Sequence, residues 1–137
     1  AFIGHDQAYL LKTNNNIIAS AIVSAGKALS DYWLLHALVT DKTCRGKGYA
    51  SKLLQIILTE KTQENTIRYN KLICFAEDNL ASFYLANQFK IFNADTDIAT
   101  LPKEFQQRLK SYQKKQPTLS CFCSFNYTVT PSSEINT

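Results

Sequence analysis

Glycine, proline and long apolar runs are scarce in this chain. Only four glycines and three prolines occur among its 137 residues, so glycine falls well below its typical share of about 7%. No apolar run approaches the roughly 18 residues that a membrane-spanning helix needs. The first residues, 1–9, lack the basic start and the long apolar segment of a secretory signal. We therefore expect a cytoplasmic protein with no membrane contact.

Cysteine is present but is not spaced for a metal site. Cys44, Cys74, Cys121 and Cys123 contain no C-x-x-C pair, and both histidines lie far from them in sequence. We therefore expect no metal, and reduced thiols as is usual in the cytoplasm. Cys121 and Cys123 should share one strand face as small buried side chains. Cys74 should be inert in a buried strand, and Cys44 has no histidine placed to assist it.

The apolar content is sufficient for a core, whereas the net charge is small. Hydrophobic residues make up 45% of the chain, and 15 basic against 11 acidic residues give a formal charge of +4. We expect one domain over residues 1–129 and a polar tail over 130–137. A charge of +4 suits an anionic small ligand. Because the basic residues are dispersed, we rank nucleic acid last among the candidate partners.

The hydrophobic pattern predicts six strands and three helices. The expected strands are 8–13, 17–23, 32–40, 71–76, 89–92 and 119–129, with an asparagine turn at 14–16. The expected helices are 49–60, 80–87 and a third that begins at Pro102 and ends before Pro117. Asp78 or Asn79 is placed to cap the second helix.

The order of these elements predicts a mixed sheet. The strand–helix–strand unit over 32–76 should form a right-handed parallel crossover, and the other neighbouring strands should pair antiparallel. We therefore expect an α/β (α+β) domain with a mostly antiparallel sheet around one parallel unit.

The turn before the first helix has the composition of an anion site. Gly46 and Gly48, half of all the glycines, remove the Cβ atoms that would keep a ligand from the unpaired amides of the helix start. Ala50 keeps the next turn small. Arg45, Lys47 and Lys52 add positive charge to that of the helix dipole. The segment predicts a cradle for phosphate or pyrophosphate, and its alternative is a tight turn with surface lysines.

Two common phosphate motifs do not fit this turn. A P-loop requires G-x-x-x-x-G-K-[ST], which is missing here. A dinucleotide fingerprint requires G-x-G-x-x-G, but Ser51 stands at the third glycine position.

The turn and its flanks resemble another family. R-x-x-G-x-[GA], with Arg45, Gly48 and Ala50 at the key positions, resembles the acetyl-CoA pyrophosphate loop of the GNAT N-acetyltransferase superfamily. The preceding segment 38–40 is similar to the strand whose backbone holds pantetheine in that family. Residues 79–89 resemble its later motif, an asparagine-containing helix start followed by F-Y-x-x-x-G-F.

The resemblance implies a set of site residues. Those implied for acetyl-CoA are Leu38, Val39, Thr40, Arg45, Gly46, Lys47, Gly48, Tyr49, Ala50, Ser51 and Asn79. Tyr84 matches the family's general acid, which protonates the CoA thiolate; its alternative is an aromatic packed on a helix. His36 interrupts an apolar strand and resembles the base histidine of the arylalkylamine acetyltransferase branch, and an imidazole has a suitable pKa. The alternative for His36 is a core histidine whose ring nitrogens are hydrogen-bonded.

Other bases remain open at this point. Asp31 and Tyr32 are weaker candidates, and deprotonation through water needs no single base.

The chain departs from the family pattern in three ways. Asn79 lies nearer to Tyr84 in the sequence than is usual in the family. Gln88 replaces the usual glycine after the second helix, and about seven residues precede the first strand where the family usually has a strand and two helices. We therefore expect an acceptor site that is open, completed by a second copy in a homodimer, or covered by the helix over 102–116.

The resulting hypothesis is an acetyl-CoA-dependent N-acetyltransferase. The resemblance implies that a primary amine, on a small molecule or a protein, attacks the thioester directly in a ternary complex. The alternatives are a CoA-binding module without catalysis and, last, a nucleic-acid-binding domain.

Overall fold

A two-stranded hairpin begins the sheet of this protein, which a computed structural model describes over residues 6–27 and 31–126. β1 (Asp6–Thr13) and β2 (Asn16–Ala25) pair antiparallel through a turn at 14–15. Asn14 adopts a φ of 52°, a left-handed conformation that asparagine tolerates better than most residues. The predicted hairpin is therefore confirmed, with a turn one residue shorter than expected.

Six strands form one mixed sheet in the order β1-β2-β3-β4-β6-β5. β3 (Tyr32–Thr40) pairs antiparallel with β2 and parallel with β4 (Lys71–Glu77). β6 (Leu119–Phe125) lies between β4 and the two-residue β5 (Lys90–Ile91), antiparallel to both. The α+β class and the parallel crossover predicted from the element order are confirmed.

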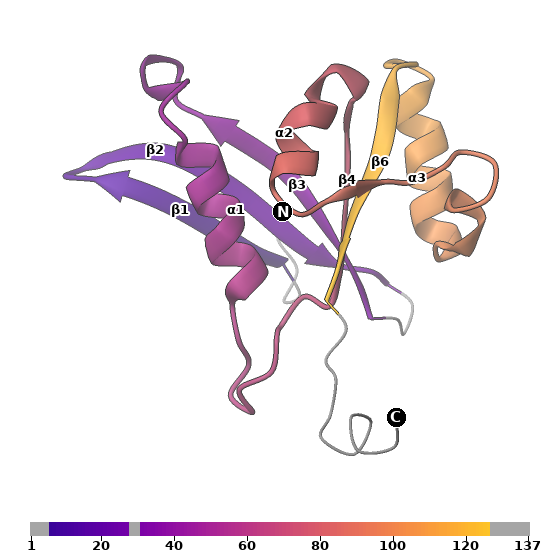
Figure 1. Ribbon diagram of the computed structural model, residues 1–137, viewed down its shortest axis with the longest axis horizontal. Helices are drawn as coiled ribbons and strands as arrows, with labels where there is room; N and C mark the ends of the chain where they lie inside the picture. Colours follow the sequence, from indigo (N-terminus) through magenta and orange to yellow (C-terminus); the bar gives the residue numbers. More distant parts are fainter. Residues whose placement is uncertain (1–5, 28–30, 127–137) are drawn as a thin grey trace.

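Helices cover the two faces of the sheet unequally (Figure 1). α1 (Tyr49–Thr59) and α2 (Ala81–Ala86) pack on one face, where Leu53, Ile57 and Tyr84 join one buried cluster. α3 (Lys103–Gln113) packs on the other face with Phe105 and Leu109. We call these the α1 face and the α3 face.

β3 and β4 separate part of the way along their length (Figure 1). Their pairing runs from Tyr32–Lys71 to Leu35–Cys74 and ends there. Directly beyond that point β3 bulges, since His36 pairs with Ile22 and Val39 pairs with Ser20, which leaves two residues opposite one. Within the bulge Ala37 has a φ of 55°, and this local kink turns the rest of β3 away from β4.

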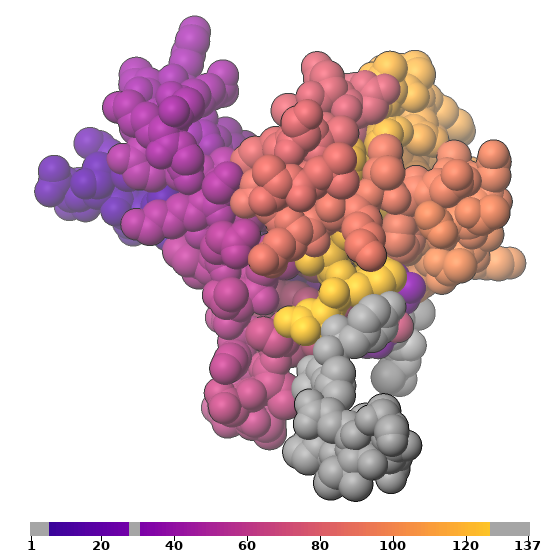
Figure 2. Space-filling view, in the orientation of Figure 1, coloured from indigo at the N-terminus to yellow at the C-terminus, as the bar shows by residue number. Residues whose placement is uncertain are grey.

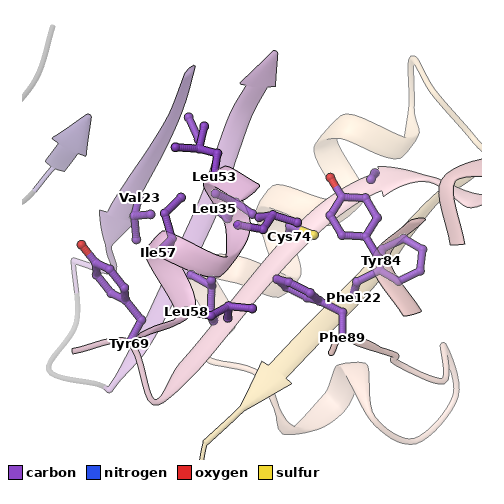
Figure 3. Close-up of a cluster of buried hydrophobic side chains, with 14 of the residues drawn as sticks. Val23, Leu35, Leu53, Ile57, Leu58, Tyr69, Cys74, Tyr84, Phe89 and Phe122 are labelled. Carbon is purple, nitrogen blue, oxygen red and sulfur yellow. The ribbon is translucent and has the colours of Figure 1, made fainter. Parts of the chain in front are cut away.

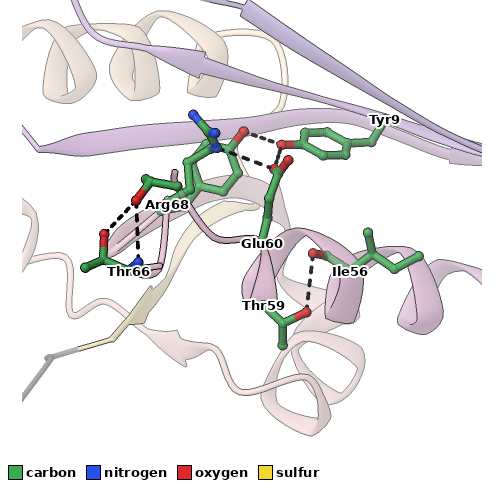
Figure 4. Close-up of polar contacts among 8 residues, drawn as sticks. Tyr9, Ile56, Thr59, Glu60, Thr66 and Arg68 are labelled. Carbon is green, nitrogen blue, oxygen red and sulfur yellow. Dashed lines mark hydrogen bonds and ion pairs between the residues drawn. The ribbon is translucent and has the colours of Figure 1, made fainter. Parts of the chain in front are cut away.

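A polar cluster joins the C-terminal end of α1 to β1 (Figure 4). The Tyr9 hydroxyl donates to the Glu60 carboxylate and also hydrogen-bonds with the Tyr69 hydroxyl. Arg68 Nε lies 3.8 Å from Glu60 Oε2. Burial and these bonds raise the pKa of Tyr9, so its hydroxyl stays protonated as a donor. The cluster fixes α1 against the sheet at the end opposite to its glycine turn.

The other predicted boundaries hold within a few residues, with one wrong capping prediction. A 3₁₀ turn, η2 (Asp78–Leu80), precedes α2, and neither Asp78 nor Asn79 forms a side-chain cap there. The 3₁₀ turn is the physical reason, because it places Leu80 at the cap position of the α-helix. The predicted tail over 130–137, and the last residues of the predicted strand to 129, lie outside the described residues.

Candidate functional site

A slot between the separated strands β3 and β4 is the first of two adjacent cavities. It has a volume of about 380 Å³, a size typical of small-molecule pockets. Its walls come from β3, β4, α2 and the end of α3: Leu35, His36, Ala37, Leu38, Cys74, Phe75, Ala76, Glu77, Leu80, Tyr84, Tyr112, Gln116 and Leu119. A notch in the surface separates the chain around α1 from the chain around α2 (Figure 2).

Tyr84 lines this slot from the α1 face. Its ring stacks on Phe122 with centroids 5.0 Å apart, and it meets Phe89 edge-on (Figure 3). The residue is only 5% exposed, and burial, with the neighbouring Cys74 thiol, raises the pKa of its hydroxyl. The packed-aromatic interpretation of Tyr84 is therefore confirmed, and the residue also lines the slot with its hydroxyl protonated.

His36 lines the same slot from the α3 face. It lies two residues after Leu34 on β3 and therefore on the same face, where Leu34 belongs to the α3 cluster. Its Nε2 lies 2.7 Å from Ser24 Oγ, a partner that no sequence signal identified. The ring is partly open to solvent, and packing around the rest lowers the pKa of His36 below its ordinary 6.5. Asp6 opposes this shift and Arg108 reinforces it, so His36 is neutral at pH 7.

The segment predicted to hold pantetheine runs from the slot toward the second cavity. Leu38 packs against the buried cluster of the α1 face, and Thr40 lines the second cavity. Since the pairing of β3 with β4 ends at Leu35, the β4 side of this segment presents backbone groups that an extended ligand can pair with.

The second cavity is the predicted glycine turn, with a volume of about 350 Å³. Its walls are Thr40, Cys44, Arg45, Gly46, Gly48, Tyr49, Ala50, Ser51 and Phe83. Gly48 is the N-cap of α1 and no side chain caps this helix start. The first helical bond is the one from Lys52 N to Gly48 O, which leaves the amides of residues 49–51 without helical acceptors.

The two glycines of this turn are required by their backbone conformation. Gly46 has a φ of 78° and Gly48 a φ of 80°, a region that costs other residues roughly 1–2 kcal/mol. A Cβ at either position would meet no atom within 4 Å, so the space in front of the amides is open. Arg45 lies beside it, with its Nε donating to Thr40 O at 3.3 Å. The turn thus fits a pyrophosphate.

Asn87 joins α1 to the end of α2 beside the second cavity, and it was not predicted from the sequence. It is 5% exposed, and its Nδ2 donates to Ser51 Oγ at 3.1 Å and to Phe83 O at 2.8 Å. Gln55 Nε2 donates to its Oδ1 at 3.5 Å. The bond to Ser51 ties the first turn of α1 to α2, which holds Tyr84. No pattern in the local sequence distinguishes Asn87 from the neighbouring polar residues, because its structural role depends on hydrogen bonds between two helices.

Three predicted residues are not in the walls of either cavity. Asn79 is exposed on η2, Lys47 is exposed in the glycine turn, and Val39 is 53% exposed on the α3 face. Each of the other ten predicted residues lines one of the two cavities: three line the slot and seven line the cavity at the glycine turn.

The cysteines are free thiols, of which Cys74, Cys121 and Cys123 are buried. Burial raises the pKa of Cys74, and it raises the pKa of Cys121 to about 12. The buried thiols are therefore protonated, and the predicted burial of all three is confirmed. Over residues 6–27 and 31–126 no three His, Cys, Asp or Glu side chains gather to hold a metal ion. Within the same residues, no helix is long and apolar enough to cross a membrane.

Comparisons with known proteins show the family of this chain. The family model for the acetyltransferase (GNAT) domain matches residues 4–91, more than half of the chain. A comparison with curated proteins found no similar sequence.

Several solved structures share the fold. N-acetylglutamate synthase from Neisseria gonorrhoeae, complexed with coenzyme A and N-acetyl-glutamate, aligns with a TM-score of 0.66 and 16% identity over 88% of this chain. This chain spans only 26% of the synthase chain. Tetrahymena GCN5 aligns with a TM-score of 0.63 and 13% identity, over 94% of this chain and 73% of its own. Escherichia coli ElaA aligns with a TM-score of 0.60 and 13% identity, over 89% and 70%.

Proposed function

The chain belongs to the GNAT acetyltransferase family, and we propose that it transfers an acetyl group from acetyl-CoA to a primary amine. The observation that carries the proposal is that one segment of β3 contributes to both cavities, since Leu38 lines the slot and Thr40 lines the cavity at the glycine turn. The glycine turn with its free amides and the slot with Tyr84 and His36 are joined by the segment 38–40.

In this proposal the glycine turn binds the pyrophosphate. The amides at the start of α1 and the positive end of the helix dipole face the phosphates, and Arg45, Lys47 and Lys52 supply charge. Pantetheine lies along segment 38–40 as an added extended strand, which directs the thioester into the slot.

The catalytic groups then act from opposite faces of the sheet. The amine nitrogen bonds to the thioester carbonyl carbon while the backbone amides near Val39 polarise the carbonyl oxygen. As the C–S bond breaks, Tyr84 gives its proton to the departing thiolate. Neutral His36, directly or through water, takes the proton that the amine loses. No covalent bond to the protein forms.

Titration calorimetry with acetyl-CoA tests the cofactor site. Gly48→Glu should abolish binding, because it places a carboxylate and its bulk against the pyrophosphate. Gly48→Ala is the matched control: it carries the same backbone strain without the charge and should retain measurable affinity. Unchanged affinity in Gly48→Glu would refute the cradle.

Release of the CoA thiol in the presence of a panel of primary amines tests the reaction. Amine-dependent release supports an N-acetyltransferase. Tight acetyl-CoA binding without release for any amine would instead favour the catalytically inactive CoA-binding module.

We also propose a second copy of the chain as the partner and the cytoplasm as the compartment. On the α3 face of β1–β3, Leu10, Ser20 and Val39 form one cross-strand row, and Leu10 and Val39 are 49% and 53% exposed. A homodimer through this row would extend the wall beside His36. In sedimentation experiments the wild type should be a dimer and Leu10→Lys should be a monomer. A monomeric wild type would contradict the proposal. The free thiols are in keeping with a reducing compartment.

A further inference from the structure

The α3-side mouth of the slot contains one carboxylate among its lining residues, that of Glu77. Glu77 ends β4 two residues after Phe75, which packs on the α3 cluster, so both side chains lie on the α3 face. His36 lies on the facing strand, β3, and also lines the slot. Because the two strands have already separated at this level, the carboxylate and the imidazole lie on opposite walls of one opening.

Neutral donors hold the Glu77 carboxylate in place. Gln116 Nε2 donates to Oε1 at 3.3 Å, and the hydroxyl of Thr118 donates to Oε2. Among the residues that the structure describes, no lysine or arginine makes a salt bridge with Glu77. The side chain is half-buried, so the slot contains an oriented negative charge that the protein leaves without a cation.

The surface beside this carboxylate is apolar and aromatic. Tyr112, at the end of α3, meets Phe75 edge-on with centroids 6.2 Å apart. It is 46% exposed although it is a large aromatic. Methylene groups pack favourably on such rings, and ring faces attract cations.

From this arrangement we infer that the acceptor is a small diamine, whose second ammonium group binds Glu77 while its methylene chain lies on Phe75 and Tyr112. The inference rests on the proposed function and adds the class of its acceptor. A carboxylate against the reacting nitrogen would favour its protonated form and oppose attack. Glu77 therefore suits the distal, permanently charged end, and the near amine reaches neutral His36 on the other wall.

The experiment compares 1,5-diaminopentane with pentylamine, which has the same chain and lacks the second charge. For the wild type, kcat/KM should be at least about tenfold higher for the diamine, as one charge-assisted contact provides. In Glu77→Gln this ratio should fall to about two, the statistical advantage of two equivalent amines. The loss should come through KM for the diamine, and it should be several times larger than any change for pentylamine. Equal losses for both amines, or no preference in the wild type, would overturn the inference.

Two further variants control this result. Glu64→Gln removes an exposed carboxylate from the loop between α1 and β4, and it should leave the ratio as in the wild type. Tyr112→Lys adds a positive charge at the mouth without altering Glu77, and it should weaken the diamine more than pentylamine. A ratio unchanged in Tyr112→Lys would also contradict the inference, and this variant remains informative if Glu77→Gln folds poorly.

Direct binding separates this inference from the proposed function. In calorimetry, 1,5-diaminopentane is titrated into wild type and Glu77→Gln saturated with CoA. Binding that is about tenfold weaker in the variant, with no acetylation of any amine, would retain the diamine site and refute the transferase. If pentylamine is acetylated as efficiently as the diamine, the transferase function is supported and the diamine site is refuted.

Discussion

Tyr84 and His36 line one cavity from opposite faces of the same sheet. A central sheet normally separates its two faces completely. Here the faces communicate because β3 bulges at Ala37 and its pairing with β4 stops at Leu35–Cys74. In the proposed reaction, a donor bound over the α1 face and an acceptor that enters from the α3 face would therefore meet between the proposed acid Tyr84 and the proposed base His36.

Replacing Tyr84 with Phe should slow turnover and spare cofactor binding. Phenylalanine keeps the stack on Phe122 and removes only the proton donor. We expect kcat to fall by about 10²-fold or more, as for loss of a general acid. The acetyl-CoA dissociation constant should stay within about twofold of the wild type, because the glycine turn is untouched. Steady-state kinetics and calorimetry measure the two quantities, and an unchanged kcat would remove Tyr84 as the acid.

The pH dependence should identify His36. Since its pKa lies below 6.5, the imidazole is neutral above that value and becomes protonated as the pH falls through it. We expect kcat/KM of the wild type to decline on the acid side below pH 6.5. In His36→Gln the rate should be lower and this decline should be lost.

Ser24→Ala is the matched control for this experiment, because it keeps the imidazole and removes only its hydrogen bond. Its rate should fall less, with the acid decline retained. The same decline in His36→Gln as in the wild type would show that another group is the base.

Gln88→Gly should stabilise the fold. Gln88 has a φ of 72° and is exposed. Relief of the left-handed strain, roughly 1–2 kcal/mol, exceeds the entropy that glycine adds to the unfolded chain, roughly 0.5–1 kcal/mol. We expect the free energy of unfolding in urea to rise by about 0.5–1 kcal/mol.

Gln63→Gly serves as the comparison, since Gln63 is exposed and has no positive φ. It should lose a little stability. If both variants change the unfolding free energy alike, backbone strain at Gln88 is not the cause.

Tyr9→Phe should destabilise the protein by about 1–3 kcal/mol, because it leaves Glu60 and the buried Tyr69 hydroxyl without their shared partner. Urea denaturation measures the change. Tyr49→Phe removes a hydroxyl for which the described residues show no hydrogen bond, and it should stay within about 0.5 kcal/mol of the wild type. Equal stability of the two variants would contradict a structural role for the Tyr9 cluster.

The order of strands and helices, the parallel unit and the glycine turn could all be predicted from the sequence. Alternation of apolar residues and the position of Gly46 and Gly48 are local patterns, and local sterics make them informative. The sequence also showed that Gln88 replaces the glycine usual in the family. Only the structure shows that the backbone at this position is left-handed, with a positive φ.

Contacts between distant residues were decided by the tertiary structure alone. Asn87 contacts Ser51 across two helices, and Glu77 shares a mouth with Tyr112 and His36 from three separate elements. The spacing of residues in the sequence carries no information on these contacts, because they depend on how far β3 turns away from β4 and on which face of the sheet α3 covers. The sequence alone determined that a glycine turn precedes the first helix, because local sterics restrict positive φ values. Only the packing of the sheet determined which side chains lie around the slot between β3 and β4.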